Sequence, residues 1–271
     1  MSTSHAEYSL GGTEIEKQRL LTQVQPYEPM ARELLERVQV KSGWRVADIG
    51  CGPIGILNLL SEAVGSQGQV FGVEREARFA AMAREEAARR GLQNVTIVQA
   101  DGFATGLSKG TLDMVHERLV LMHVPNREAF VAEMLSLLRP GGTIALEDVD
   151  NSSWLCHPAH DSWTTLFDAF HEAFHKSGGD GFLGRRLPGL LRTAGIQDVK
   201  TKIYADVLQI GDYRRTHLIS LIDSIRGKIV EAGVLSDDDL ERHKRMLADH
   251  LANPATTVVE KLLVQSWGVK P

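Results

Sequence analysis

The chain has 271 residues, of which 43% are hydrophobic and 24% charged, and its 30 basic and 35 acidic side chains give a formal net charge of −5. This composition is ordinary for a globular protein and excludes a disordered chain or a collagen-like repeat. The mild acidity, with no run of Lys and Arg longer than two residues, argues against nucleic acids and membrane surfaces as partners.

The first 40 residues predict a helical segment ahead of the main domain. Apolar residues recur at helical spacing within 13–25 and again within 30–38. Pro26 and Pro29 lie between the two stretches, so we expect them to separate two helices.

Strands and helices alternate over the next hundred residues. We expect strands at 44–50, 69–74, 95–101, 111–116 and 143–148, and helices at 57–64, 76–90 and 128–138. Such alternation with short connections is typical of a Rossmann-like, doubly wound α/β fold, in which helices cover both faces of a mostly parallel sheet. Ligands of these sheets bind at the edge where the parallel strands end.

The pattern changes after residue 150. Helices are expected at 162–176, 187–195, 213–232 and 237–251, and strands at 199–207 and 258–267, although a helix is also compatible with the last range. The two late strands would complete a seven-stranded sheet in one domain over 41–271. Insertions at about 151–180 and 213–251 would form a helical cap over the ligand-binding edge.

A glycine loop follows the first expected strand. Its pattern is Asp48-x-Gly50-x-Gly52-x-x-Gly55, and a helix begins directly after it. Glycine lets the backbone approach a ligand closely, and the start of the helix offers unpaired N–H groups. The glycine pattern alone also fits a dinucleotide-binding fold.

Acidic residues at three successive strands narrow the choice of ligand. Asp48 would repel a pyrophosphate and attract an ammonium group. Glu74, 26 residues later, could accept hydrogen bonds from both hydroxyls of a ribose. Asp101, another 27 residues on, precedes Gly102 and Phe103, which could hold the edge and face of an adenine.

The segments VADIGCGPIG, VFGVE, VQADGF and LRPGGTIALED resemble the class I S-adenosylmethionine-dependent methyltransferases, of the type that modifies small molecules. The resemblance covers residues 40–150 and continues more weakly through 187–204. It implies S-adenosylmethionine as the cofactor. The residues that it assigns to cofactor binding are Asp48, Gly50, Cys51, Gly52, Glu74, Asp101, Gly102, Phe103, Glu117 and Arg118.

Within the glycine loop, the resemblance does not give every residue the same role. The backbone of the loop would contact the methionine part, while the Cys51 side chain is expected to face the core. Members of the family more often carry G-x-G-x-G, so the role of Gly55 is left open by the resemblance.

His123 is the candidate catalytic residue, because an imidazole there could accept a proton from a hydroxyl or amine of the acceptor. The alternative is a packing residue beside Val124 and Pro125. His116 is either a pocket residue or a structural one. His171 and His175 lie one helical turn apart, but with no suitable third ligand nearby we expect no metal.

Three aromatic residues are candidate substrate contacts. Tyr8 and Tyr27 belong to the N-terminal segment, which folds over the cofactor as a lid in similar enzymes, and Trp154 follows the fifth expected strand, where it could form a wall of the acceptor pocket. The alternative for the tyrosines is packing between helices.

These observations predict methyl transfer from S-adenosylmethionine to the oxygen, nitrogen or aromatic carbon of a small natural product or metabolite. The alternatives are an NAD(P)-dependent oxidoreductase, and a cyclase or binding protein that uses the cofactor structurally. Two distant cysteines and the lack of a signal-peptide pattern or a long apolar stretch predict a cytoplasmic protein. A homodimer is left open.

Overall fold

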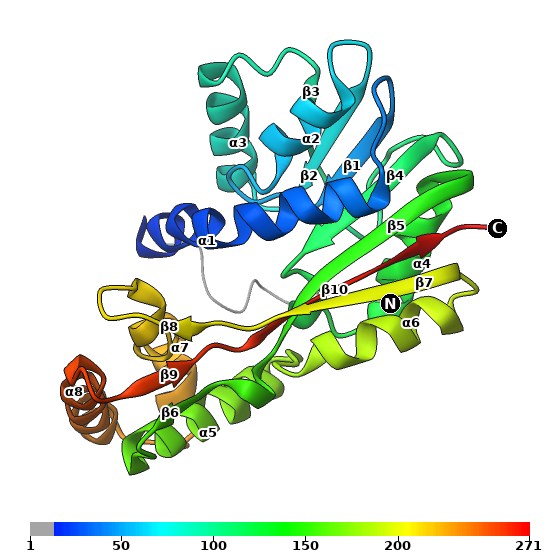
Figure 1. Ribbon diagram of the computed structural model, residues 1–271. Helices are drawn as coiled ribbons and strands as arrows, with labels where there is room; N and C mark the ends of the chain where they lie inside the picture. The colour runs from blue at the N-terminus through cyan, green and yellow to red at the C-terminus, as the bar shows by residue number, and fades with distance from the viewer. Residues whose placement is uncertain (1–13) are drawn as a thin grey trace.

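A seven-stranded sheet forms the centre of the protein in the computed structural model, which describes the backbone of residues 14–271 and the side chains of residues 26–271. The strand order is β3-β2-β1-β4-β5-β10-β7, and β1 to β5 run parallel while β10 is antiparallel to both of its neighbours (Figure 1). This confirms the expected fold class. The strands are β1 (Arg45–Ile49), β2 (Gln69–Glu74), β3 (Val95–Gln99), β4 (Leu112–Arg118), β5 (Leu138–Asp150), β7 (Gln197–Tyr204) and β10 (Leu262–Val269).

Helices cover both faces of this sheet because its central strands bury apolar side chains in both directions. On one face, Val46 and Met114 pack with α1 and α2, and on the other, Ala47 and Val115 pack with α4 and α6. The helices around the sheet are α1 (Glu14–Val38), α2 (Leu57–Val64), α3 (Ala77–Arg89), α4 (Arg127–Leu137) and α6 (Leu187–Thr193). Within residues 14–271, no helix is both long and apolar enough to cross a membrane.

The expected break at Pro26 and Pro29 is wrong, because α1 continues through both prolines. A proline inside a helix removes a backbone hydrogen bond, at a cost of about 3 kcal/mol. Packing against the sheet compensates: Ala31 and Leu34 are completely buried on the side of α1 that faces α2.

Three other expected strands have different bounds. The strand expected at 143–148 begins earlier, at Leu138, and includes Gly141 and Gly142, which exchange backbone hydrogen bonds with Lys270 just after β10. The expected strands 199–207 and 258–267 each divide, and the pieces nearest the cap form a second sheet. That three-stranded antiparallel sheet has the order β6-β9-β8 and comprises β6 (Leu155–His157), β9 (Thr257–Val259) and β8 (Val207–Leu208).

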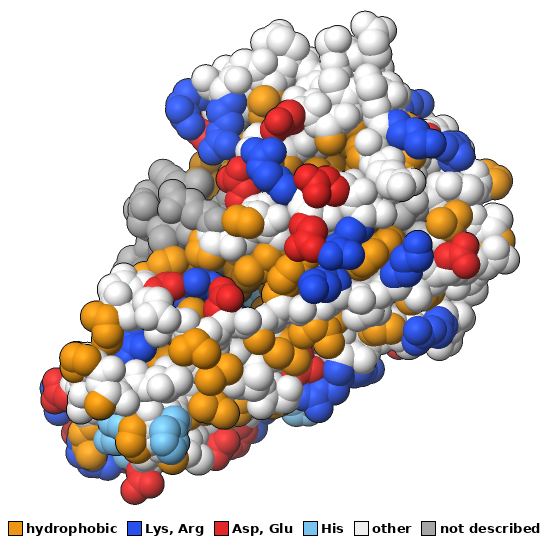
Figure 2. All heavy atoms as spheres, in the orientation of Figure 1, with side chains coloured by type: hydrophobic (Ala, Val, Ile, Leu, Met, Phe, Trp, Pro, Cys, Tyr) orange, Lys and Arg blue, Asp and Glu red, His pale blue; other side chains and the backbone are white. Residues whose placement is uncertain are grey.

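The cap combines this small sheet with three helices, α5 (Asp161–Lys176), α7 (His217–Glu231) and α8 (Asp237–Ala252). Helix α5 packs against both α7 and α8. Figure 2 shows a hollow in the surface between α1 and the cap, with acidic and basic side chains beside it. Short 3₁₀ turns lie in the connections: η1 (Leu121–His123) between β4 and α4, η2 (Asn151–Ser153) between β5 and β6, η3 (Leu183–Arg186) between α5 and α6, and η4 (Tyr213–Thr216) between β8 and α7.

The strand order reverses next to β1, which pairs with β2 on one side and β4 on the other. Connections leave such a point in opposite directions, and this opens a crevice at the carboxyl ends of the two central strands. The glycine loop follows β1, and Glu117 and Arg118 end β4, so both predicted groups of residues lie at this crevice.

Candidate active site

The loop after β1 depends on glycine at three positions. Gly50, Gly52 and Gly55 have φ angles of 75°, 55° and 49°, in the left-handed region that other residues rarely adopt. A Cβ at Gly55 would lie 2.5 Å from Asp48 Oδ2, whereas a Cβ at Gly52 would meet no described atom within 4 Å. Gly55 is therefore needed to close the loop onto Asp48, and Gly52 presents open backbone at the crevice.

Glu74 lies at the end of β2 and contacts this loop. Its Oε2 accepts a hydrogen bond from the backbone N–H of Gly52 (2.9 Å), and its Oε1 accepts one from the N–H of Glu76 (2.8 Å). Burial raises the pKa of the Glu74 carboxyl. Cys51, beside Gly52, turns its side chain into the core. The acid and the open backbone therefore form one polar surface.

Asp101, Gly102 and Phe103 follow β3 in a tight turn. The Asp101 carboxylate accepts a hydrogen bond from the N–H of Phe103 (2.9 Å). The Phe103 ring is 41% exposed and packs edge-on against Phe130, with ring centroids 5.3 Å apart. A Cβ at Gly102 would lie 2.3 Å from the Phe130 ring, so a larger residue there would force this ring to shift. The turn thus presents an exposed aromatic ring beside an acid.

Asp48 is buried beneath the loop, where it forms a three-residue cluster with His116 of β4 and Glu147 of β5. His116 donates from Nδ1 to Asp48 and from Nε2 to Glu147, both at 2.8 Å. The second Asp48 oxygen accepts from the N–H of Ile56, just before α2, at 3.4 Å. Asp48 therefore anchors the glycine loop on its buried side. Its contact with a methionine ammonium stays a prediction.

The cluster extends to α1. Gln265 of β10 donates from its amide to Glu147 (2.7 Å) and to the backbone carbonyl of Met30 (3.0 Å). Burial alone would lower the pKa of His116, but the two carboxylates outweigh it and raise the pKa to about 9. A charged imidazolium thus joins the glycine loop, four strands and the N-terminal helix.

At the end of β4, Glu117 is completely buried and its Oε2 accepts from the N–H groups of Val120 (3.1 Å) and Leu121 (3.3 Å). Asp148 of β5 accepts from the N–H of Met122 (2.9 Å). Burial raises the pKa of Glu117 to about 8, and burial together with the nearby Glu117 raises that of Asp148. The two acids hold η1 in place.

Two neighbouring residues at the end of β4, Glu117 and Arg118, each have a buried polar atom that no described residue satisfies with a hydrogen bond. Glu117 Oε1 and Arg118 Nη1 are buried and have no hydrogen-bond partner among the residues that the structure describes. The Arg118 guanidinium lies 5.9 Å from the centre of the Tyr27 ring. Buried polar atoms without partners are uncommon in folded proteins, and here they point to a bound ligand at the crevice.

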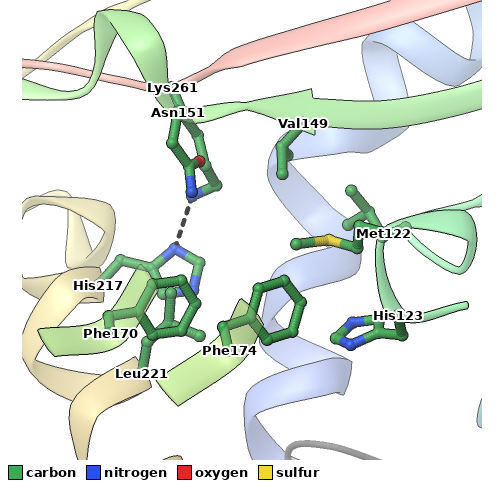
Figure 3. A pocket seen from close by; sticks show the side chains of 10 residues that line it. Met122, His123, Val149, Asn151, Phe170, Phe174, His217, Leu221 and Lys261 are labelled. Atoms are coloured by element: carbon green, nitrogen blue, oxygen red, sulfur yellow. Dashed lines mark hydrogen bonds between the residues drawn. The ribbon is translucent and has the colours of Figure 1, made fainter. Parts of the chain in front are cut away.

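A cavity of about 480 Å³, including its opening to solvent, lies between η1, the end of β5 and the cap. His123 lines it, and its ring packs edge-on against Phe174 with centroids 5.2 Å apart. Figure 3 shows the imidazole beside Met122 and Phe174. The lining residues are Leu119, Met122, His123, Val149, Asn151, Phe170, Phe174, His217, Leu221 and Lys261.

The aromatic substrate candidates lie elsewhere. Trp154 is 4% exposed and packs behind the cavity wall, with Lys261 Nζ 4.6 Å from its ring centre. Tyr27 is also 4% exposed, beneath Arg118, and burial raises its pKa. Tyr8 lies outside the described residues. Direct contact of Trp154, Tyr27 or Tyr8 with an acceptor stays a prediction.

Sequence reasoning missed most of the polar residues of the cavity. Asn151, His217 and Lys261 come from segments far apart in the chain and share no spacing pattern. A buried position for Lys261 had one weak signal, the apolar residues on both sides of it at 258–267.

The glycine loop at the point where the strand order reverses, with acids at the ends of three neighbouring strands, defines an α/β fold that binds a nucleoside-type cofactor. A family profile described as a methyltransferase domain matches residues 40–195. The chain therefore belongs to this methyltransferase family, as its motifs predicted.

Two relatives that match part of the chain are also named as methyltransferases. Aklanonic acid methyltransferase DauC of Streptomyces sp. (strain C5) is 34% identical over 122 residues, which are 45% of this chain and 56% of the relative. Nocamycin O-methyltransferase of Saccharothrix syringae is 34% identical over 125 residues, 46% of this chain and 45% of the relative. The chain thus matches about half the length of these relatives.

The fold has solved counterparts. A SAM-dependent methyltransferase from Aquifex aeolicus superposes with a TM-score of 0.51 at 19% sequence identity, over 74% of this chain and 95% of that one. At this identity the superposition supports the fold alone.

The charged cluster predicts a specific pH dependence of stability. His116 has a folded-state pKa of about 9 against an ordinary value of 6.5. Its stabilising effect is complete below pH 6.5 and lost as the pH rises through 9, a loss on the order of 3 kcal/mol. The free energy of unfolding, measured by denaturant titration at pH 6.5 and at pH 9.5, gives this loss.

The matched control is Glu117→Gln, which removes another buried group whose raised pKa, about 8, also lowers stability as the pH rises. Most of the loss should remain in this variant. An unfolding free energy that stays constant from pH 6.5 to 9.5 in Glu117→Gln would contradict a charged His116.

Proposed function

We propose that the protein transfers a methyl group from S-adenosylmethionine to the oxygen, nitrogen or aromatic carbon of a small natural product or metabolite. The observation that carries this proposal is the cavity between η1 and the cap, because it adjoins the cofactor crevice at the ends of β4 and β5. The names of the two relatives, aklanonic acid methyltransferase and nocamycin O-methyltransferase, support a natural product as the acceptor.

The crevice fits the cofactor. Glu74 would hold the ribose hydroxyls, and Asp101 with the exposed Phe103 ring would hold the adenine. The accessible backbone at Gly52 and the buried atoms Glu117 Oε1 and Arg118 Nη1, which have no described hydrogen-bond partner, would hold the methionine part of the cofactor. When bound, S-adenosylmethionine supplies an activated methyl group together with a good leaving group.

The remaining work of the protein is alignment, exclusion of water and removal of one proton. The apolar walls around Phe170 and Phe174 position the acceptor and keep water out. The His123 imidazole lies in the cavity wall, where it would accept a proton from an acceptor hydroxyl or amine as the new bond forms.

Two alternatives remain distinguishable by experiment. An NAD(P)-dependent oxidoreductase would be stabilised against heat by NADH, whereas we expect stabilisation by S-adenosylhomocysteine and none by NADH. A cyclase or binding protein would bind S-adenosylhomocysteine but transfer no label. Incubation of the protein with methyl-labelled S-adenosylmethionine and a panel of aromatic polyketide acids, followed by mass spectrometry, should show label in a small molecule.

We also propose a cytoplasmic location and a small-molecule partner in preference to a nucleic acid. The composition that motivated these expectations supports them, and a homodimer is left open.

Glu74→Ala should weaken the binding of S-adenosylhomocysteine by about 2 kcal/mol, because charge-assisted hydrogen bonds to the ribose are lost. Titration calorimetry measures the dissociation constant. Glu76→Ala, two residues away, is the control, because the Glu76 carboxylate pairs with Arg75, and it should bind nearly as tightly as the wild type. Equal dissociation constants for wild type and Glu74→Ala would remove Glu74 from the cofactor site.

His123→Gln should lower kcat for an acceptor hydroxyl by about 100-fold or more, because a glutamine cannot accept the proton. The dissociation constant of S-adenosylhomocysteine should not change. His175→Gln on the exposed side of α5 serves as the control histidine. Full activity in His123→Gln would show that the acceptor loses its proton without this imidazole.

A further inference from the structure

Asn151 of η2 lines the cavity and takes no part in the chemistry proposed above. The residue is 2% exposed, and Figure 3 shows it on the far side of the cavity from His123. Its Oδ1 is buried and has no hydrogen-bond partner among residues 26–271. A buried carbonyl oxygen without a partner is unfavourable, so a ligand group that donates to it would gain binding free energy.

His171 of α5 fixes the orientation of the Asn151 amide. His171 Nδ1 donates to the carbonyl of Phe167 (2.8 Å), so Nε2 of the neutral ring accepts a hydrogen bond. The group that donates to Nε2, at 2.9 Å, must therefore be the Asn151 amide nitrogen. Burial lowers the pKa of His171, which keeps the ring neutral at pH 7. Because His171 lies outside the lining that the described residues form, the amide turns its nitrogen away from the cavity and its oxygen towards it.

The surroundings of the amide hold it in this orientation. The Phe167 and Phe182 rings pack on the His171 imidazole, with centroids 4.1 Å and 4.7 Å from its own. Gly181 leaves room for the hydrogen bond, since a Cβ there would lie 2.7 Å from His171 Nε2 and 2.8 Å from the Asn151 amide nitrogen. The backbone N–H of Asn151 donates to the carbonyl of Gly181 at 3.0 Å. The amide is thus ordered before a ligand binds, which reduces the entropy that binding would cost.

An amide oxygen fixed in this way discriminates between ligands by their hydrogen-bonding groups. A hydroxyl or an N–H would satisfy Asn151 Oδ1, whereas an ether, a carbonyl or a halogen in the same place would leave it without a partner. A site that is built to receive a hydrogen bond rejects an analogue of the same shape that lacks the donor.

Most of the remaining cavity lining is apolar, and it comprises Leu119, Met122, Val149, Phe170, Phe174 and Leu221. These side chains fit the apolar body of a ligand but offer it no hydrogen bonds. A single polar contact in such a cavity therefore orients the ligand and determines which ligands fit.

We infer that Asn151 is a specificity-determining residue, whose Oδ1 accepts a hydrogen bond from a hydroxyl or an N–H group of the methyl acceptor. This inference rests on the proposed function, because it names the chemistry of the molecule that the methyltransferase cavity takes. That molecule has an apolar body and carries its donor at the end away from His123. A hydroxyl and an N–H share this recognition chemistry, and the experiment separates them.

Titration calorimetry at pH 7 on the full chain saturated with S-adenosylhomocysteine tests the inference. Phenol and indole are the probes that carry a donor, and fluorobenzene and benzofuran are their counterparts of similar shape without one. At least one donor probe should bind about 10-fold more tightly than its counterpart, because only the donor satisfies the buried oxygen. The pair that shows the preference identifies the donor as a hydroxyl or an N–H.

Equal or weaker binding of the donor probe within both pairs would overturn the inference, since an ordered water alone would then satisfy the oxygen. Failure of both phenol and indole to bind to protein that binds S-adenosylhomocysteine would overturn it as well. Failure of S-adenosylhomocysteine itself to bind would instead contradict the proposed function, so the two results are separate.

Variants assign the preference to Asn151. Asn151→Leu has a similar volume and no polar atom, so the preference for the donor probe should disappear. Asn151→Asp keeps an oxygen in the same place and should keep the preference, which a merely structural role would not predict. Asn253→Leu, at an exposed asparagine after α8, is the control and should behave as the wild type. A preference that persists in Asn151→Leu, or that is lost equally in Asn151→Asp, would overturn the assignment.

A crystal structure of the wild type with S-adenosylhomocysteine and the preferred probe provides a second test if Asn151→Leu does not fold. The donor atom of the probe should lie within hydrogen-bond distance of Asn151 Oδ1, roughly 3 Å. A probe that donates only to other groups, with a water on Oδ1, would overturn the inference.

Discussion

The arrangement of this site depends on a single buried charge, the His116 imidazolium held between Asp48 and Glu147. A lone charge in a protein core is strongly unfavourable, so each member of the cluster is stable only while the other two are in place. Because the members come from β1, β4 and β5, correct pairing of the strands and correct closure of the cofactor loop become one event. Through Gln265 the same requirement extends to α1.

A second pair of strand-end acids performs the equivalent task for the acceptor side. Glu117 and Asp148 accept hydrogen bonds from consecutive N–H groups of η1, so the turn that carries His123 is fixed to the sheet. The candidate base is thus positioned by β4 and β5, and β4 also carries two of the residues predicted to contact the cofactor, Glu117 and Arg118. The opposite wall of the cavity comes from the cap, whose helices contribute Phe170, Phe174 and other side chains. Under the proposed function, the candidate base and the walls that would select the acceptor therefore come from different parts of the chain.

The sequence predicted the first five parallel strands and the glycine loop well, because strand, loop and acid are adjacent there and local spacing determines geometry. It failed at α1, where tertiary packing outweighs two prolines, and at β6, where three residues are too few for a period-two pattern. His116 was left undecided, since burial between two acids depends on strand register. Lys261 and Asn151 were missed because only the fold brings them together.

Only two residues, Glu260 and Lys261, separate β9 of the cap from β10 of the central sheet. A tether this short transmits displacement, so a swing of the cap would pull β10 out of register with β5. We therefore expect the cap to keep its position relative to the central sheet. Room for an incoming molecule would then come from rotation of side chains around the cavity, and the aromatic lining would limit the size of that molecule.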